Sequence, residues 1–500
     1  MKGPSRRVLV LGLDGGTFDL LDPLMEAGEL SFLRSLAAKG VRAPLRSVYP
    51  AKTIPAWYSF ATGRDPGELG VFGFAEPTEE PGRSSLVRSF RPIEAFWDRL
   101  SRVGIKVGIV NFPVLSGYPL HGFVLPGMLS EGAVTYPRTL RSEVEAALGA
   151  TYPGELPPFR EAERGAWVAR ATRAIRRRAQ AAATLAERHR PGFLFALFRE
   201  TDRVEHQLWN ELDRPVGQIP SDLLEFWRTV DRACADVDRA FRSGGGSALT
   251  LVISDHGHGR IRSDFLTNRW LYREKLLVFR SAPRALTVRA AVARLALLAQ
   301  RLPHGTSVSR RLADLLRDRR HVDLARLIDH SSFEASSDRI DWRRTVAFSY
   351  PVPEGIYLNP FNPDLTPERR ARVLADIRRR LEAYPEAKIE VFRPEELYRG
   401  RNLAKAPSLL IRVDGMETEP RMDFAYPREL IRDRPSFFYG CGTHRMNGIL
   451  LGAGDGIVPG TPLGPRALLD LAPTILETMG VRASTEFAGR SFASELCPGA

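Results

Sequence analysis

The sequence lacks several features that mark whole classes of protein. It contains only three cysteines, Cys234, Cys441 and Cys497, too few and too irregularly spaced for a disulfide framework or a cysteine-based zinc site. Nowhere do about 20 uncharged apolar residues follow one another, so no transmembrane helix is expected. The apolar run near the N-terminus, Val8 to Leu13, is too short for the core of a signal peptide. These absences favour a reducing compartment, and we expect a cytoplasmic protein.

The composition is that of a large globular protein. The chain has 500 residues, of which 43% are hydrophobic and 9% aromatic, and no low-complexity tract is long enough to indicate disorder. Its net charge of +13 favours anionic partners such as phosphate esters, nucleic acid or anionic lipid, but an arginine-rich composition alone also explains it. No nucleic-acid-binding motif with interleaved aromatic residues is present.

The most informative stretch is Leu251 to Gly259, an apolar run that ends in an Asp-His pair followed by glycines. Ala248 to Ile253 shows no alternation of polar and apolar residues, which indicates a central parallel strand covered on both faces. Asp255 and His256 follow this strand, at the end where ligand sites form in such sheets. We therefore interpret them as metal ligands.

Two further predicted strands are followed by acidic residues. Arg7 to Leu13 runs into Asp14, and Phe193 to Phe198 is followed by Asp202 and His206. Asp202 and His206 are four residues apart, so one turn of helix places both side chains on the same face. Three strand ends that each supply a carboxylate, two of them with a nearby histidine, predict a metal centre rather than scattered surface charge.

A threonine is predicted at the start of a helix. Pro55 suits the first turn of this helix and Gly63 its end, which places Thr53 at or just before the N-terminus. Free backbone N–H groups and the helix dipole favour an anion such as phosphate there. A threonine at this position is also a common N-cap, so only the metal-type residues elsewhere suggest a function for it.

The order of elements predicts an α/β fold with a doubly wound, mainly parallel sheet. We assign residues 1–260 and 436–500 to this core, and residues 261–435, where short strands mix with helices, to an inserted α+β cap that sets substrate specificity. His444, a candidate last ligand, is expected on a flexible glycine-rich loop. In the cap, the basic stretch Arg284 to Arg320 could touch a membrane surface, although a solvated helix face is the commoner explanation.

Six motifs, in this order, resemble the alkaline phosphatase superfamily. More narrowly, they resemble its type I phosphodiesterase and nucleotide pyrophosphatase branch, together with a bacterial and archaeal group described as predicted phosphohydrolases or phosphomutases. The motifs are Asp14-Gly15-Gly16, Lys52-Thr53-x-Pro55, Asp202-x-x-x-His206, Asp255-His256-Gly257, Gly442-Thr443-His444 and the closing Leu471-Ala472-Pro473-Thr474-Ile475-Leu476.

The resemblance implies an alkaline phosphatase-like core that binds two divalent metal ions. Histidine and carboxylate ligands suit Zn²⁺ best, and Mn²⁺ or Fe also fits. Thr53 matches the nucleophile, which bridges toward the second metal and forms a covalent phospho-threonine. The residues that match metal ligands are Asp202, His206 and His444 for the first ion and Asp14, Asp255 and His256 for the second.

Two departures from related families narrow the expected activity. In nucleotide pyrophosphatases an asparagine downstream of the nucleophile binds the phosphoryl oxygen, and Phe74 stands in its place here. Lys52 and Arg445 are the nearest candidates for a replacement. The Cys-x-Pro-x-Arg motif of sulfatases is absent, since Thr53 occupies the position of the convertible residue.

The expected function is therefore metal-dependent hydrolysis of small phosphate esters, with diesters favoured. The alternatives are a phosphomonoesterase or phosphomutase acting on a phosphorylated metabolite, and a metal-bound binding module that has lost turnover. His258 is expected to lie behind the ligands or to face solvent. Asn111, after a predicted strand, is expected to form a turn.

Overall fold

The structure is a computed structural model that describes residues 6–87, 94–127, 134–280, 337–422, 424, 428–432, 440–483 and 485–497. The chain divides into two compact units, the first made of Met1–Val71, Val87–Gly259 and His444–Ala500 and the second of Phe72–Leu86 and Arg260–Thr443. The core predicted from the sequence, residues 1–260 and 436–500, differs from the first unit in two ways. It includes Phe72–Leu86, and its boundaries lie at residues 260 and 436 instead of Gly259 and His444.

The segment Phe72–Leu86 belongs to the second unit because of its tertiary contacts. It forms a hairpin of β3 (Ala75–Pro77) and β4 (Ser84–Leu86). The Ser84 hydroxyl lies 2.7 Å from the Tyr350 hydroxyl, and the ring centroids of Phe72 and Tyr398 lie 5.3 Å apart. Both partners are distant in sequence, so the pattern along the chain could not assign the hairpin.

The centre of the first unit is formed by three adjacent parallel strands. β1 (Arg7–Leu13) pairs with β7 (Phe193–Phe198) on one side and β8 (Ala248–Ile253) on the other. All three are almost continuously apolar and buried, as is typical of strands that are covered on both faces. Their bounds are those predicted from the sequence.

The register of these strands decides where their ends lie. Leu13 is level with Phe198, and Gly12 is level with Ile253. The backbone N–H of Asp14 donates to the carbonyl of Phe198 at 3.2 Å. The residues that follow the three strands therefore emerge at one edge of the sheet.

The remaining strands complete an eight-stranded sheet in the order β19-β2-β18-β8-β1-β7-β5-β6. Beyond β7, the sheet is extended by β5 and then β6, both in parallel. β18 is antiparallel to both of its neighbours, β8 and β2. This mainly parallel sheet confirms the predicted fold class. The added strands are β2 (Val41–Arg46), β5 (Val107–Val110), β6 (Gly122–Leu125), β18 (Asn447–Gly454) and β19 (Arg466–Ala467).

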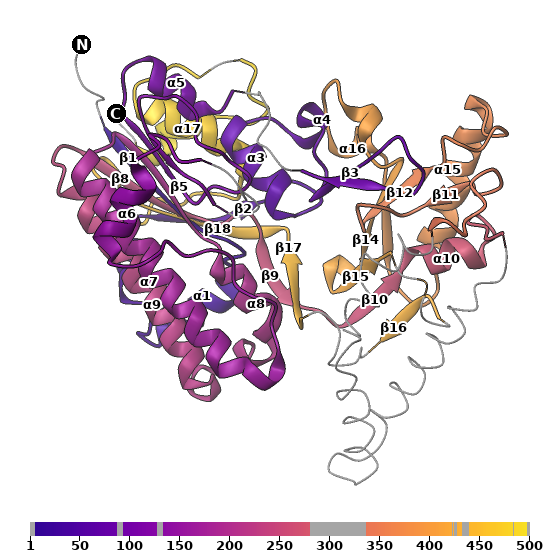
Figure 1. Ribbon diagram of the computed structural model, residues 1–500, viewed down its shortest axis with the longest axis horizontal. Helices are drawn as coiled ribbons and strands as arrows, with labels where there is room; N and C mark the ends of the chain where they lie inside the picture. The colour runs from indigo at the N-terminus through magenta and orange to yellow at the C-terminus, as the bar shows by residue number, and fades with distance from the viewer. Residues whose placement is uncertain are drawn as a thin grey trace, which may run out of the picture. The chain divides into compact units, whose positions relative to one another are not determined.

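Helices cover both faces of this sheet (Figure 1). The long helices α7 (Arg164–His189) and α9 (Ser221–Arg242) pack on one face. On the other face lie α3 (Thr53–Thr62), α5 (Phe96–Arg102) and α17 (Leu471–Thr478). α3 is anchored by Trp57, whose ring packs edge-on against Phe195 of β7 at a centroid distance of 5.3 Å.

The second unit is built on a mostly antiparallel sheet, β11-β12-β14-β15-β10-β16, to which β13 is added at β14. Among the described strands of this unit, only the β10–β15 pair is parallel. Its elements are β10 (Ser263–Leu266), α10 (Thr267–Arg273), β11 (Ala347–Phe348), β12 (Gly355–Leu358), α15 (Pro367–Glu382), β13 (Ile389–Phe392), β14 (Leu409–Val413), β15 (Thr418–Arg421) and β16 (Leu430–Arg432).

Two expectations concern membranes. The basic stretch Arg284 to Arg320 lies outside the described residues. No helix in the described part of the chain combines the length and the apolar character that a membrane span requires.

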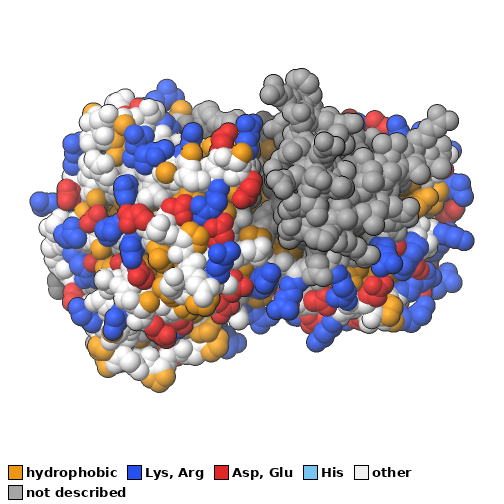
Figure 2. Space-filling view, turned by 90° about the horizontal axis from the view of Figure 1, so that it is seen from below, with side chains coloured by type: hydrophobic (Ala, Val, Ile, Leu, Met, Phe, Trp, Pro, Cys, Tyr) orange, Lys and Arg blue, Asp and Glu red, His pale blue; other side chains and the backbone are white. Residues whose placement is uncertain are grey.

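Charges are interspersed on the first unit's surface in Figure 2, and Arg164 and Arg176 of α7 pair with Asp222 and Glu225 of α9.

Candidate metal centre

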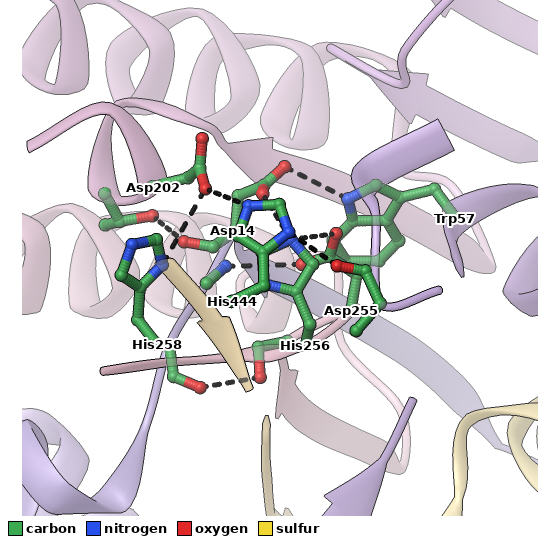
Figure 3. A network of polar contacts seen from close by, with 12 residues as sticks. Asp14, Trp57, Asp202, Asp255, His256, His258 and His444 are labelled. Carbon is green, nitrogen blue, oxygen red and sulfur yellow. Dashed lines mark hydrogen bonds and ion pairs between the residues drawn. The ribbon is translucent and has the colours of Figure 1, made fainter. Parts of the chain in front are cut away.

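The carboxyl ends of the three central strands carry a cluster of buried acidic and imidazole side chains (Figure 3). Asp14 follows β1, and Asp255 and His256 follow β8. Asp202 comes from α8 (Glu200–Leu212), which begins just after β7. Asp14, Asp255 and His256 have no exposed surface, and Asp202 is 4% exposed.

Asp14, Asp255 and His256 form the first of two groups of potential ligands. His256 Nε2 lies 3.7 Å from Asp14 Oδ1 and 3.2 Å from Asp255 Oδ2. One ligand atom from each residue lies within 4.8 Å of the others. These are the residues that the family resemblance assigns to the second metal.

Each member of this group is anchored by one atom and leaves another unpaired. Asp14 Oδ2 accepts from the Trp57 indole at 3.1 Å, Asp255 Oδ1 accepts from the backbone N–H of Gly15 at 3.3 Å, and His256 Nδ1 lies 3.1 Å from the carbonyl of Gly257. Asp14 Oδ1, Asp255 Oδ2 and His256 Nε2 are buried without a hydrogen-bond partner. Such atoms need partners, and this set of donors fits a divalent cation.

A second group forms around Asp202. His206 Nε2 and His444 Nε2 lie 2.9 Å apart, and they lie 3.2 and 3.3 Å from Asp202 Oδ1. Ligands about 2.1 Å from a tetrahedral ion lie about 3.4 Å apart, so these three atoms also fit one cation. Asp202 and His444 also belong to an alternative set of potential ligands in the described chain, which includes His256 and His258 in place of His206.

Burial makes this cluster electrostatically costly without a cation. Burial raises the pKa of the Asp14 carboxyl well above its usual range, and the charge of Asp202 adds to the effect. The pKa of Asp255 is raised by burial and by Asp14. Although burial opposes it, His206 holds the pKa of Asp202 well below its usual range. Burial also lowers the pKa of His256, so its imidazole stays neutral and can act as a ligand.

Thr53 is the first residue of α3 and is 2% exposed. Trp57, one turn further along the helix, bonds to Asp14, while the carbonyl of Ala51 accepts a hydrogen bond from His444 Nδ1. These contacts fasten the start of α3 to both ligand groups. The N-cap position belongs to Lys52, whose side chain makes no capping hydrogen bond, so the N-cap explanation for Thr53 is wrong.

Comparison with family models matches residues 8–414 to type I phosphodiesterase / nucleotide pyrophosphatase. The chain belongs to this family. The match confirms the family resemblance inferred from the six motifs, and it identifies the chain as a metal-dependent phosphohydrolase. A search of curated proteins finds no match.

Solved structures resemble the chain in fold. Phosphonoacetate hydrolase from Sinorhizobium meliloti 1021 has a TM-score of 0.55 at 15% identity, with 94% of each chain covered. Human ectonucleotide pyrophosphatase / phosphodiesterase 5 has a TM-score of 0.53 at 12% identity over 98% of each chain, and the murine protein 0.51 at 13% over 96%. At these identities the likeness shows an alkaline phosphatase-like fold.

Within this family fold, several residues lie where the sequence did not place them. His444 is on strand β17 (Gly442–Arg445), which pairs with β9 (Gly257–Arg260), and not on a flexible loop. His258 does not face solvent, because it is fully buried, and it belongs to a group of potential metal ligands. Asn111, in contrast, has a positive φ of 65°, which fits the expected turn, and it donates to the carbonyl of Leu197 and accepts from Arg178.

The two candidate phosphate-binding cations differ in their surroundings. Burial and the charge of His206 lower the pKa of His444, and the charge of Lys52 adds a smaller contribution in the same direction. The Arg445 guanidinium packs against Gly259, where a Cβ atom would lie 2.7 Å from Arg445 Nε, and it donates to the carbonyl of His444.

The sequence analysis missed Glu205. This residue lies on α8 three positions after Asp202, is fully buried, and has a carboxylate oxygen 3.6 Å from His258 Nδ1. The signal was available, since residues three apart on a helix share a face just as residues four apart do.

Proposed function

We propose that this enzyme hydrolyses small phosphate esters, diesters in preference to monoesters, by transferring the phosphoryl group to Thr53 at a centre of two divalent cations. The observation that carries the proposal is the convergence of three buried, unpaired atoms from Asp14, Asp255 and His256, beside the helix that begins with Thr53. A purely structural cluster would satisfy such atoms within the protein.

Each ion has a proposed set of ligands. Asp202, His206 and His444 hold the first ion, and Asp14, Asp255 and His256 hold the second. Mixed imidazole and carboxylate donors favour Zn²⁺, with Mn²⁺ or Fe as alternatives. When bound, such ions lower the pKa of a nearby hydroxyl and neutralise charge on the attacking and leaving oxygens.

The residues of the chain then divide the chemistry between them. The bond from Thr53 Oγ1 to phosphorus forms as the ester P–O bond breaks, and the alcohol leaves on the opposite side. Water next cleaves the bond between Thr53 and phosphorus, which releases the product and restores the hydroxyl. The uncapped start of α3 offers backbone N–H groups to the phosphoryl oxygens.

Lys52 is the proposed substitute for the phosphoryl-binding asparagine of nucleotide pyrophosphatases. Phe74 at the asparagine position cannot donate a hydrogen bond. Lys52 directly precedes Thr53 and its charge acts on His444, whereas the Arg445 guanidinium packs against Gly259 of β9. Substrate selection by the second unit and a cytoplasmic location stay predictions.

The test compares hydrolysis of bis-p-nitrophenyl phosphate and p-nitrophenyl phosphate, with Zn²⁺ or Mn²⁺, by wild type, Thr53→Ala and a control. The control is Thr62→Ala, which alters a buried threonine of the same helix that bonds to the carbonyl of Tyr58. We expect a metal-dependent preference for the diester that is lost in Thr53→Ala and kept in Thr62→Ala.

The other outcomes reassign the enzyme. Preference for the monoester favours a phosphatase, or a phosphomutase if the phosphoryl group passes to a second hydroxyl instead of water. Absence of turnover while both ions are bound favours a binding module. Wild-type turnover by Thr53→Ala contradicts the covalent route.

A further inference from the structure

Helix α8, which carries two of the proposed ligands, is not continuous. Asp202 and His206 lie in its first part, whereas Leu208 has a φ of −125° and a ψ of 19°, outside the helical range. A break of this kind separates the turns before it from the turns after it. The position of the ligand-bearing part therefore depends on contacts of its own.

Each part of α8 is tied to α7 by an arginine. Arg164 pairs with Glu211 in the second part at 2.6 Å, and Arg178 Nε donates to Glu200 Oε1 at the start of the first part at 2.8 Å. The side chains of Arg164 and Glu211 are 20% and 22% exposed, whereas those of Arg178 and Glu200 are 5% and 4% exposed. The ion pair that serves the ligand-bearing part is thus the buried one.

The guanidinium of Arg178 is held in three directions. Besides the bond to Glu200, its Nη1 donates to Asn111 Oδ1 and its Nη2 to the carbonyl of Gly154, both at 3.0 Å. Asn111 follows β5, and its Nδ2 donates to the carbonyl of Leu197 in β7 at 2.7 Å. Because the guanidinium is planar and rigid, bonds from all three nitrogens fix its orientation. It therefore ties Glu200 to the ends of β5 and β7.

The residue after Glu200 joins the start of α8 to the other ligand group. Thr201 Oγ1 lies 2.6 Å from the carbonyl oxygen of Asp14 and 2.8 Å from that of Phe198. The start of α8 is thus held on two sides, by Arg178 through Glu200 and by the backbone of Asp14 through Thr201. Asp202 is the next residue along the helix.

Stability alone does not account for a buried ion pair, because desolvation of both charges offsets most of their attraction and apolar side chains of similar volume often serve as well. A fixed direction is what apolar side chains do not supply. We infer that Arg178 and Glu200 are positioning residues, which hold the first part of α8 so that Asp202 and His206 meet one metal ion. This role rests on the proposed function, because it takes both residues as ligands of the first ion.

The test measures the affinity for each ion separately. Arg178→Met and Glu200→Leu are combined, so that no buried charge is left without its partner. Zn²⁺ binding in a chelator-buffered series is then titrated in the Asp14→Asn background, which keeps the ligands of the first ion, and in the His206→Ala background, which keeps those of the second. We expect the combined variant to bind the first ion about tenfold or more weakly, with the affinity for the second ion unchanged.

The matched control removes the ion pair at the other end of α8. Arg164→Met combined with Glu211→Leu acts beyond the break at Leu208, and both affinities should stay unchanged. Arg178→Lys is the conservative variant, which keeps a charge beside Glu200 but not the planar, three-way geometry. It should weaken binding of the first ion by less, and it answers the question if the combined variant does not fold.

Three outcomes overturn the inference: unchanged affinity for the first ion, equal losses for both ions, or the same loss in the control. Equal losses would mean that the ion pair only stabilises the fold. In each case the proposed function stands if wild type binds two ions and its turnover depends on Thr53. Wild type that binds no Zn²⁺ would remove the proposed function and this inference together.

Discussion

Two buried polar groups, one in each unit, are built in opposite ways. In the second unit Asn268 Nδ2 donates to the carbonyls of Ser349 and Met422 at 2.7 and 2.8 Å, and its Oδ1 accepts from the N–H of Ser349 at 2.7 Å. In the first unit Asp14 and Asp255 each leave a buried oxygen without a hydrogen bond. Asn268, Asp14 and Asp255 all have no exposed surface.

Asn359 extends the pattern of the second unit. Its Nδ2 donates to the carbonyls of Trp342 and Thr345, and its Oδ1 accepts from the N–H of Phe361. Asn268 joins backbone segments that no strand pairing joins, and Asn359 extends the β11–β12 pair by binding the segment before β11. Saturated buried polar groups therefore hold the backbone together, whereas unsaturated groups at the strand ends of the first unit indicate a ligand.

The largest expected effect follows from changing one unsaturated group. Asp14→Asn should lower metal-dependent turnover about a thousandfold or more, because the Asn oxygen can still accept from Trp57 while the amide faces the ion. The stability of the metal-stripped protein should stay the same or rise, since a buried negative charge is removed. Turnover within tenfold of wild type, or a marked loss of stability without metal, would remove Asp14 from the ligand set.

The next effect concerns the ions themselves. A cation at 100 times its dissociation constant should stabilise the folded protein by about 2.7 kcal/mol per site. Burial raises the pKa values of Asp14 and Asp255, so in the stripped protein their contribution to stability is present at low pH and lost as the pH rises through those values. The gain on adding metal should therefore grow with pH.

Thermal unfolding with and without Mn²⁺ at pH 7 and 8.5 checks this prediction. Unfolded histidines, with pKa values near 6.5, are largely neutral throughout that range, and buried His256, whose pKa is lowered, is neutral in the folded protein. Metal stabilisation that is larger at pH 7 than at pH 8.5 would contradict the direction of the cited shifts.

Changing a buried polar group whose hydrogen bonds are all made should lower the stability of the protein, in contrast to Asp14→Asn. Asn268→Ala leaves the two carbonyls and the N–H that it bonds without their partner, and it should lower the free energy of unfolding by about 2–4 kcal/mol. The loss should be the same with and without metal ions. Denaturant titration measures it, and a loss that appears only in one metal state would break the comparison.

The smallest effect is expected at a buried carboxylate of the first unit that is saturated. Asp231 of α9 accepts from the N–H groups of Phe32 and Leu33, each at 2.9 Å, at the start of α2 (Ser31–Lys39). Leu30 at the N-cap offers no side-chain bond. Asp231→Ala should cost about 1 kcal/mol of stability and leave metal binding unchanged, as measured by denaturant titration and metal content.

The sequence predicted the parts of this architecture that depend on local pattern. β1, β7 and β8 were identified by their continuous apolar runs, and parallel strands in one sheet bring the residues after them to one edge. Thr53 was placed at a helix start because Pro55 and Gly63 bracket that helix.

The parts it missed depend on tertiary pairing. His444 follows a glycine-rich segment that resembles a loop, and only its pairing with β9 makes it part of a strand. Glu205 and His258 are buried side by side, with Glu205 Oε2 3.6 Å from His258 Nδ1, and the sequence pattern does not show this pairing. The hairpin at Phe72–Leu86 joins the second unit through partners far along the chain.

The most direct test of the account is to locate the ions. Crystals of the chain loaded with Zn²⁺ or Mn²⁺ give anomalous difference maps that place each ion. The account predicts an ion about 2.0–2.2 Å from the unpaired atoms of Asp14, Asp255 and His256, and another at the same range from Asp202, His206 and His444. Ions bound elsewhere, with these atoms bonded to water or to one another, would contradict it.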